Sequence, residues 1–135
     1  MTFKALLATN SGGAISTALT DLSESDLMPG EVTVAVDYST VNYKDALAVT
    51  GHSPVIRTFP LIPGIDLAGV VAHSTHAGIA PGDRVLVNGY GLSQTHHGGF
   101  AQRARVPGDW LVKVPDAFST REAMAIGTAM AIGTA

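Results

Sequence analysis

The sequence predicts a mostly β fold with short helices, an α+β class in which the strands form a partly open barrel or a sandwich. Fifteen glycines in 135 residues indicate many turns and few long helices. Between residues 32 and 37, valines alternate with threonine, alanine and aspartate, the pattern of a strand with one buried face. Five or more short extended stretches, separated by segments rich in glycine, proline and asparagine, complete this prediction.

The first two strands are expected at the N-terminus. Residues 3–8 and 14–22 are extended and flank the turn sequence Asn10-Ser11-Gly12-Gly13, so they predict a hairpin. The alternating strand follows after a polar segment at residues 23–30. Further strands are expected at residues 67–72, 84–87, 100–106 and 110–114.

Two helices are predicted from their capping residues. Asn42 is a suitable N-cap for a helix reaching about residue 49, with Asp45 in the first turn and Gly51 placed to end it. Ser119 and Glu122 have the spacing of a capping box, so a second helix is expected to begin there.

The C-terminal end carries a duplicated hexapeptide. The sequence MAIGTA occupies residues 124–129 and recurs unchanged at residues 130–135. A period of six fits neither an α-helix nor a heptad repeat, and each glycine inside a helix costs about 1 kcal/mol relative to alanine. The tail is therefore predicted to be a weak helix that depends on packing.

Length and composition exclude several classes of function. A chain of 135 residues fits one domain, and its net charge of −3 provides no basic field for nucleic acid or an anionic membrane. The absence of cysteine excludes disulfides, thiol catalysis and cysteine-ligated metals. With no signal-like N-terminus and no apolar run near 20 residues, a cytoplasmic location is expected.

Residues 59–71, FPLIPGIDLAGVV, are interpreted as the wall of an active-site cleft. Pro60 and Pro63 fix the backbone, Gly64 relieves the bend, and an apolar run follows that contains a single carboxylate, Asp66. A buried Asp66 would have to pair with a cation or with backbone amides, and we expect that role for it instead of catalysis.

Asn42, Tyr43, Lys44 and Asp45 place an amide, a phenol, an ammonium and a carboxylate at one helix start. Free backbone N–H groups there favour anions, so the cluster could hold the amide or phosphate of a cofactor. The alternative is structural: Asn42 caps the helix, Asp45 complements its dipole, and Tyr43 packs with its hydroxyl exposed.

The histidines and Arg57 are weaker candidates. His96 and His97 are adjacent on a predicted loop, where a solvated position is expected and a metal site is not. Arg57 could meet a phosphate or carboxylate, or could be an ordinary surface arginine. The dinucleotide fingerprint Gly-x-Gly-x-x-Gly does not occur in the 135 residues.

Residues 42–45, 59–71 and 81–85 together resemble the zinc-free quinone oxidoreductase branch of the medium-chain dehydrogenases/reductases, and within it the acrylyl-CoA reductase-like family. The resemblance implies that residues 1–122 form a GroES-like catalytic domain, a partly open β-barrel. It also implies that residues 123–135 begin an interdomain helix, and that the Rossmann domain lies beyond this chain. In zinc-dependent relatives the same stretches supply a cysteine and a histidine. Ile65 replaces that histidine here, so no metal is expected.

The resemblance also implies the chemistry. NADPH would deliver a hydride to the activated C=C bond of an acrylyl-CoA-like thioester, or to a quinone, in a parent enzyme that is a homo-oligomer. Tyr43 and Asn42 would orient the nicotinamide or assist protonation, and Lys44 and Asp45 would line the same cofactor site. Arg57 and His96 are expected on the substrate side. The isolated chain is predicted to be inactive.

A rival hypothesis assigns the chain to a different class, a non-catalytic GroES-like barrel that binds a partner or assembles into rings. It would explain an apolar chain that carries no dinucleotide fingerprint. A native mass measurement separates the two hypotheses, because a ring predicts a defined high oligomer.

Overall fold

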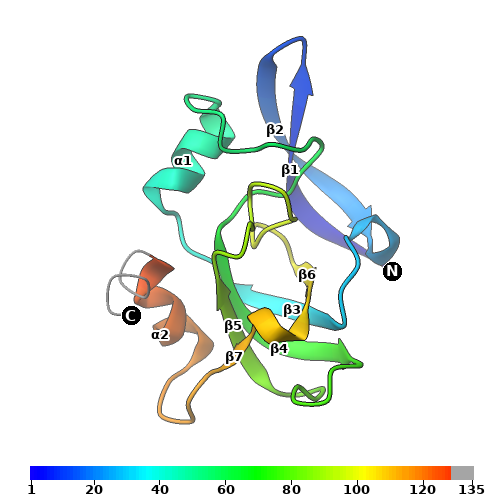
Figure 1. Ribbon diagram of the computed structural model, residues 1–135, viewed down its shortest axis with the longest axis vertical. Helices are drawn as coiled ribbons and strands as arrows, with labels where there is room; N and C mark the ends of the chain where they lie inside the picture. Colours follow the sequence, from blue (N-terminus) through cyan, green and yellow to red (C-terminus); the bar gives the residue numbers. More distant parts are fainter. Residues whose placement is uncertain (129–135) are drawn as a thin grey trace.

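The structure, a computed structural model, describes residues 1–128 and contains two antiparallel sheets (Figure 1). Strands β1 (Thr2–Ser11) and β2 (Ala14–Ser23) form a two-stranded hairpin. The second sheet has five strands in the order β6-β3-β4-β5-β7. Its members are β3 (Val32–Tyr38), β4 (Asp66–Ser74), β5 (Arg84–Asn88), β6 (Arg103–Val106) and β7 (Val112–Lys113). The predicted class, mostly β with short helices, is confirmed.

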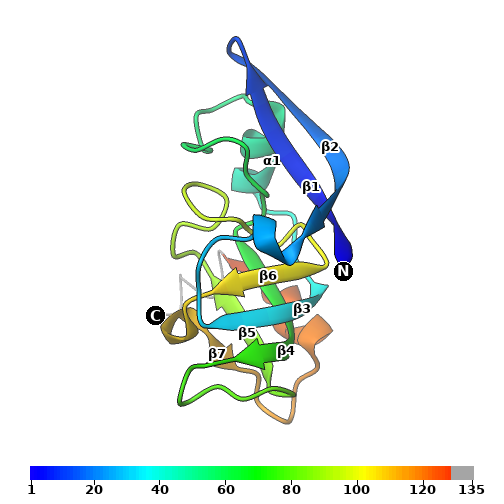
Figure 2. The same ribbon diagram turned by 90° about the vertical axis from the view of Figure 1, so that its right-hand side faces the viewer.

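The hairpin stands away from one end of the five-stranded sheet (Figure 2). Its register is continuous from Thr2↔Ser23 to Ser11↔Ala14, so the predicted turn at residues 10–13 is confirmed. Two isolated bridges, Ala5↔Ala101 and Ala8↔Leu61, join it to the rest of the chain. A cluster of buried apolar side chains at its base includes Phe3, Leu27 and Ile62.

The main core lies on the five-stranded sheet. Val32 and Val34 of β3 are fully buried and pack with Leu67 and Val71 of β4 and with apolar side chains of β5 and β6. The alternation predicted for β3 is incomplete, because Thr33 is also buried and Val36 is only half-buried, like Ala35. The guanidinium of Arg105, on the neighbouring strand β6, covers Thr33 and donates to its hydroxyl at 3.2 Å.

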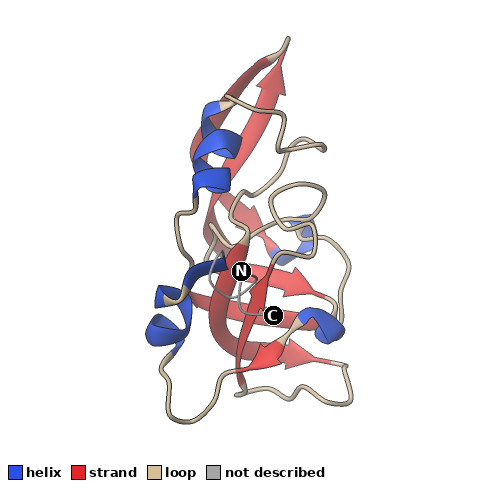
Figure 3. Ribbon diagram, turned by 60° about the vertical axis from the view of Figure 1, so that its left-hand side comes forward, coloured by secondary structure: helices blue, strands red, loops and turns tan. Residues whose placement is uncertain are grey.

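Both predicted helices begin at their predicted caps, and helices are drawn in blue in Figure 3. Helix α1 (Tyr43–Thr50) follows Asn42 and ends at Gly51, whose φ of 69° is the left-handed conformation that glycine adopts without strain. Helix α2 (Thr120–Ala125) is capped by the Ser119 hydroxyl, which accepts from the Glu122 N–H at 3.0 Å. The second copy of the hexapeptide lies outside the described residues.

The strands predicted at residues 100–106 and 110–114 are shorter than expected. Residues 100–102 pair mainly with β1 instead of β3, because Leu6 donates to the Phe100 carbonyl and Gln102 donates to the Lys4 carbonyl. Trp110 ends a short 3-10 turn, Gly108–Trp110, so that only Val112–Lys113 reaches β5. None of the helices within residues 1–128 is long and apolar enough to cross a membrane.

Candidate active site

Several segments meet at the first residue of β4. Asp66 pairs in register with Asn88 at the end of β5, and the loop between β3 and α1 lies against the same end. The segment after α2 reaches this place as well, through Thr128. Asp66 and its hydrogen-bonded neighbours form what we call the Asp66 network, which consists of Ser39, Thr40, Asn42, Asp45, Asp66 and Thr128.

The Asp66 carboxylate is fully buried and accepts hydrogen bonds on both oxygens. Oδ1 accepts from the Thr40 N–H at 2.9 Å and from the Ser39 hydroxyl at 3.2 Å. Oδ2 accepts from the Thr40 hydroxyl at 2.5 Å, from Asn42 Nδ2 at 2.9 Å and from the Thr128 hydroxyl at 2.6 Å. Asn88 Nδ2 donates in turn to the Thr128 hydroxyl at 3.1 Å, which orients it.

Asn42 joins this carboxylate to a second one. Its backbone N–H donates to Asp45 Oδ2 at 2.8 Å, and its Nδ2 lies 3.0 Å from the same oxygen. The other Asp45 oxygen accepts from the Ile65 N–H at 3.0 Å, next to Asp66 in the chain. The Asn42 and Asp45 side chains therefore tie the first turn of α1 to the start of β4, and Asp45 is fully buried.

Asp45 lies in an environment that disfavours its charged form. Burial raises the pKa of the Asp45 carboxyl, and the hydrogen bonds from Asn42 and Ile65 act in the opposite direction. The neighbouring Asp66 carboxylate adds a smaller effect that also raises this pKa. Asp45 therefore does more than complement the helix dipole, the structural role expected from the sequence, because its side chain is buried in the protein interior.

The four predicted cofactor residues differ in whether their side chains remain available to a ligand. Asn42 and Asp45 are engaged within the network, whereas Lys44 is exposed and Tyr43 is 81% exposed. Tyr43 occupies the first position of α1, directly after the bonded Asn42. An exposed phenol on a fixed backbone is the arrangement in which a side chain can serve a ligand.

The Asp66 network is held together by hydrogen bonds. Each neighbour of the carboxylate in residues 1–128 donates a hydrogen to it, whereas zinc requires lone pairs from thiolate, imidazole or carboxylate groups. Within residues 1–128 no group of three or more acidic or histidine side chains is placed to hold a metal ion.

The predicted solvated loop at His96 and His97 is wrong. His97 is buried, and its Nδ1 accepts from the Ile62 N–H at 3.1 Å. His96 Nδ1 lies 2.9 Å from the His97 carbonyl, and its buried Nε2 has no partner among residues 1–128. Burial lowers the pKa of both imidazoles. The loop is buried because Gly98 and Gly99 let it pack directly on the backbone of residues 62–66.

Arg57 is exposed, and its loop contacts the loop that carries His96. The Arg57 N–H donates to the Gln94 carbonyl at 2.9 Å. The structure thus brings the two predicted substrate residues onto neighbouring loops. It also adds Thr40 and Thr128, which sequence reasoning missed. In the sequence, the adjacent hydroxyl residues Ser39 and Thr40, shortly before the N-cap, could have indicated that Thr40 belongs to the site. No neighbouring residue gives such an indication for Thr128.

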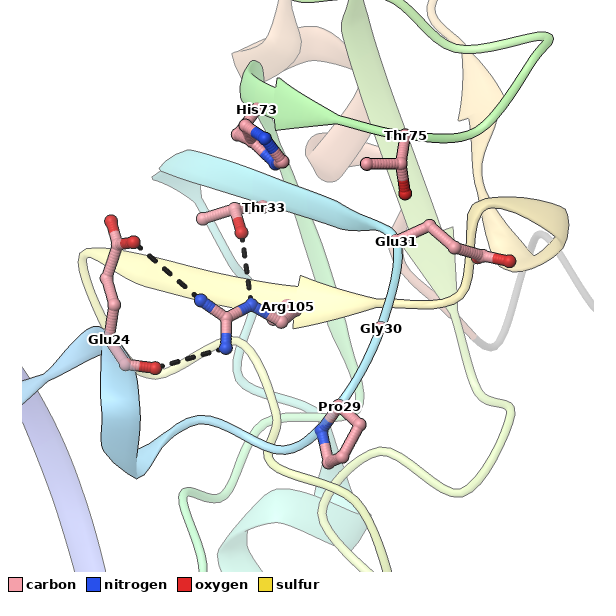
Figure 4. A pocket seen from close by; sticks show the side chains of 8 residues that line it. All are labelled: Glu24, Pro29, Gly30, Glu31, Thr33, His73, Thr75 and Arg105. Atoms are coloured by element: carbon pink, nitrogen blue, oxygen red, sulfur yellow. Dashed lines mark hydrogen bonds and ion pairs between the residues drawn. The ribbon is translucent and has the colours of Figure 1, made fainter.

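A separate pocket of about 460 Å³ lies at the opposite end of β4 (Figure 4). Its lining comprises Glu24, Pro29, Gly30, Glu31, Thr33, His73, Thr75 and Arg105. None of the predicted site residues lines it. From Asp66, the first residue of β4, to Ser74, the last, the strand advances by eight residue steps, which is about 26 Å for an extended strand.

The family of alcohol dehydrogenase GroES-like domains matches residues 28–116. The acrylyl-CoA reductase AcuI of Ruegeria pomeroyi is 48% identical over 117 residues, which is 87% of this chain and 36% of that protein. The yhdH oxidoreductase of Salmonella enterica, solved in complex with NADP, has a TM-score of 0.91 and 49% identity, over 93% of this chain and 39% of that one.

The yhfP protein of Bacillus subtilis, solved with NAD bound, has a TM-score of 0.91 and 41% identity, and it covers 96% of this chain. The chain covers 40% of yhfP. It therefore spans 36% to 40% of the length of these three relatives.

Proposed function

This chain belongs to the alcohol dehydrogenase GroES-like domain family, and from that premise we propose that it is the catalytic domain of an NADPH-dependent reductase. The proposed substrate is the activated C=C bond of an acrylyl-CoA-like thioester, with a quinone as the second candidate. The proposed domain covers residues 1–122, and the connection to a nucleotide-binding domain begins at residue 123. Similarity to an acrylyl-CoA reductase and to an NADP-bound oxidoreductase supports this proposal.

The observation that carries the proposal is the contrast between Asn42 and Tyr43. Both hydrogens of the Asn42 amide point toward acceptors of the Asp66 network, while the next side chain is left exposed. A nicotinamide cofactor fits such a group, because its planar ring can lie against a phenol and its amide can bond the hydroxyl. When bound, NADPH supplies the hydride for the β-carbon of the substrate.

The residues of this chain have distinct proposed roles. Tyr43 orients the reacting groups or donates the proton that completes reduction at the α-carbon. Asn42 acts as a positioning residue, because its amide is committed to Asp45 and Asp66. Lys44 is exposed and free to meet a cofactor phosphate, and Arg57 and His96 remain the proposed substrate residues.

A chimera tests this proposal. The matching N-terminal part of the Salmonella yhdH oxidoreductase would be replaced by residues 1–128 of this chain, which include the whole Asp66 network, and NADPH oxidation would be followed with acrylyl-CoA and with a quinone. We expect turnover with the thioester. We expect none from the 135-residue chain alone, because it contains no dinucleotide fingerprint. A folded chimera without either activity would contradict the proposal.

Variants of the chimera separate the two roles left open for Tyr43. If the hydroxyl donates the proton, Tyr43→Phe lowers kcat by about 10²-fold or more. If only the ring is used, Tyr43→Phe keeps kcat and Tyr43→Ala loses it. Lys44→Ala should raise the KM for NADPH with little change in kcat.

Nothing in residues 1–128 favours the rival role as a self-assembling module.

A further inference from the structure

Two carboxylates are buried side by side without a cation. Asp45 and Asp66 are both fully buried, and both contact the Asn42 amide. The ion pairs found within residues 1–128 all involve other acidic residues. The remaining residues, 129–135, contain no lysine, arginine or histidine that could supply a partner.

Asp66 has the hydrogen bonds of an ionised carboxylate. Its five contacts come from one backbone N–H, three hydroxyls and one side-chain amide. The Ser39 hydroxyl shares its one hydrogen with the Asp66 carbonyl, 2.8 Å away, and the other four groups donate to the carboxylate. None of these groups carries a charge. The network therefore stabilises a negative charge by dipoles alone and does not neutralise it.

Such a charge acts over a distance. Buried charges are screened much less by salt and water than exposed ones, and at an effective dielectric constant of about 20 a unit charge several ångströms away still changes an affinity severalfold or more. Asn42 links Asp66 to Tyr43, because its amide donates to Asp66 and Tyr43 is the next residue in the chain. The field of Asp66 thus reaches the place where the proposed function puts the nicotinamide.

We propose that Asp66 is a specificity-determining residue whose uncompensated negative charge makes this half of the cleft bind the oxidised nicotinamide ring in preference to the reduced one. The inference rests on the proposed function. When bound, the reduced nicotinamide would supply a hydride from C4 to the substrate β-carbon. The π electrons of the substrate C=C bond would move to the thioester carbonyl oxygen as an enolate, which then takes a proton at the α-carbon, and the nicotinamide ring would be left with one positive charge. A fixed anion beside that ring stabilises the charge as it forms.

The test needs no turnover and uses the 135-residue chain. Oxidised and reduced nicotinamide mononucleotide, which differ by this one ring charge, would be titrated into ¹⁵N-labelled protein. The amide signals of residues 42–45 would report binding. We expect the oxidised form to bind roughly tenfold more tightly than the reduced form.

Three variants refine the comparison. Asp66→Asn should remove most of the preference, because it removes the charge at nearly constant shape. Asp21→Asn makes the same change in net charge at an exposed carboxylate that pairs with Lys4, and it should keep the preference. Thr128→Val removes a neutral donor from Asp66 and leaves the charge, so the preference should also persist.

The outcomes separate this inference from the proposed function. Equal affinities of the native chain for the two forms would overturn the inference and leave the proposed cofactor site intact. If neither form shifts the signals of residues 42–45, both are overturned. The ratio measured on the native chain decides the question even if Asp66→Asn does not fold, because that ratio requires no variant.

Discussion

The charged side chains at the two ends of strand β4 lie in opposite environments, one buried and one open to solvent. At the start of the strand, the Asp66 carboxylate is fully buried and accepts from the loop between β3 and α1 and from Thr128 after α2. At the far end, Arg105 donates to the Thr33 hydroxyl and the Glu24 carbonyl, and it faces the Glu24 carboxylate at 3.7 Å across an open pocket (Figure 4). The Glu24 side chain is 47% exposed.

The difference shows that burial, more than the number of partners, decides what a charged group contributes. Water replaces any partner lost in the open pocket, so a surface ion pair there is worth 1 kcal/mol or less, roughly. No water replaces a partner lost around Asp66, and each buried donor left without an acceptor costs about 1–3 kcal/mol. We therefore expect mutations at the Asp66 end to be costly and those at the pocket end to be mild.

The largest effect is expected for Asp66→Ala. It leaves the Thr40 N–H, the Asn42 amide and the Thr128 hydroxyl without their acceptor, and the relief of a buried charge offsets only part of that loss. We expect the free energy of unfolding to fall by about 3 kcal/mol, measured by urea denaturation. Thr128→Val, which removes one donor, should cost only about 1 kcal/mol. Equal losses in the two variants would contradict a central role for Asp66.

The second effect concerns backbone packing at the same end of the strand. A Cβ on Gly99 would collide with the Asp66 carbonyl and meet Leu67 Cβ and Ser39 Oγ at 3.0 Å, so Gly99→Ala should cost about 1–3 kcal/mol or prevent folding. Among the residues that the structure describes, a Cβ on Gly78, near the other end, would meet only His76, at 3.5 Å, which is ordinary contact. Gly78→Ala should change stability by less than about 0.5 kcal/mol. Thermal unfolding of both variants tests the contrast.

Local sequence determined more of the fold than of the site. The hairpin and the N-caps at Asn42 and Ser119 were predictable, because each depends on residues within a few positions of one another. The partners of Asp66 were not, since Thr128 donates to it from 62 residues away. The burial of His97 was missed for the same reason, because its acceptor role toward Ile62 arises only when distant loops pack.

The third prediction concerns the buried His97 and the dependence of stability on pH. Burial lowers the pKa of His97 below its ordinary value of 6.5, and the nearby His96 lowers it further. The unfolded chain therefore binds a proton first as the pH falls, so stability declines below pH 6.5 until the folded-state pKa is passed. His97→Asn keeps an acceptor for the Ile62 N–H and removes the titration. Urea denaturation at pH 7.5 and 5.5 should show a smaller acid loss in the variant, and identical losses would refute this role.

The smallest effect is expected at the pocket end, for Glu24→Gln. This change removes the ion pair with Arg105 but leaves the hydrogen bonds of the guanidinium to the Thr33 hydroxyl and the Glu24 backbone carbonyl. Because the Glu24 carboxylate is largely exposed and 3.7 Å from its partner, the free energy of unfolding should fall by less than about 1 kcal/mol. The loss should shrink further at high salt, where exposed charges are screened. A loss as large as that of Asp66→Ala, or one insensitive to salt, would mean that the pocket end is held as tightly as the buried end, and the contrast between the two ends of β4 would fail.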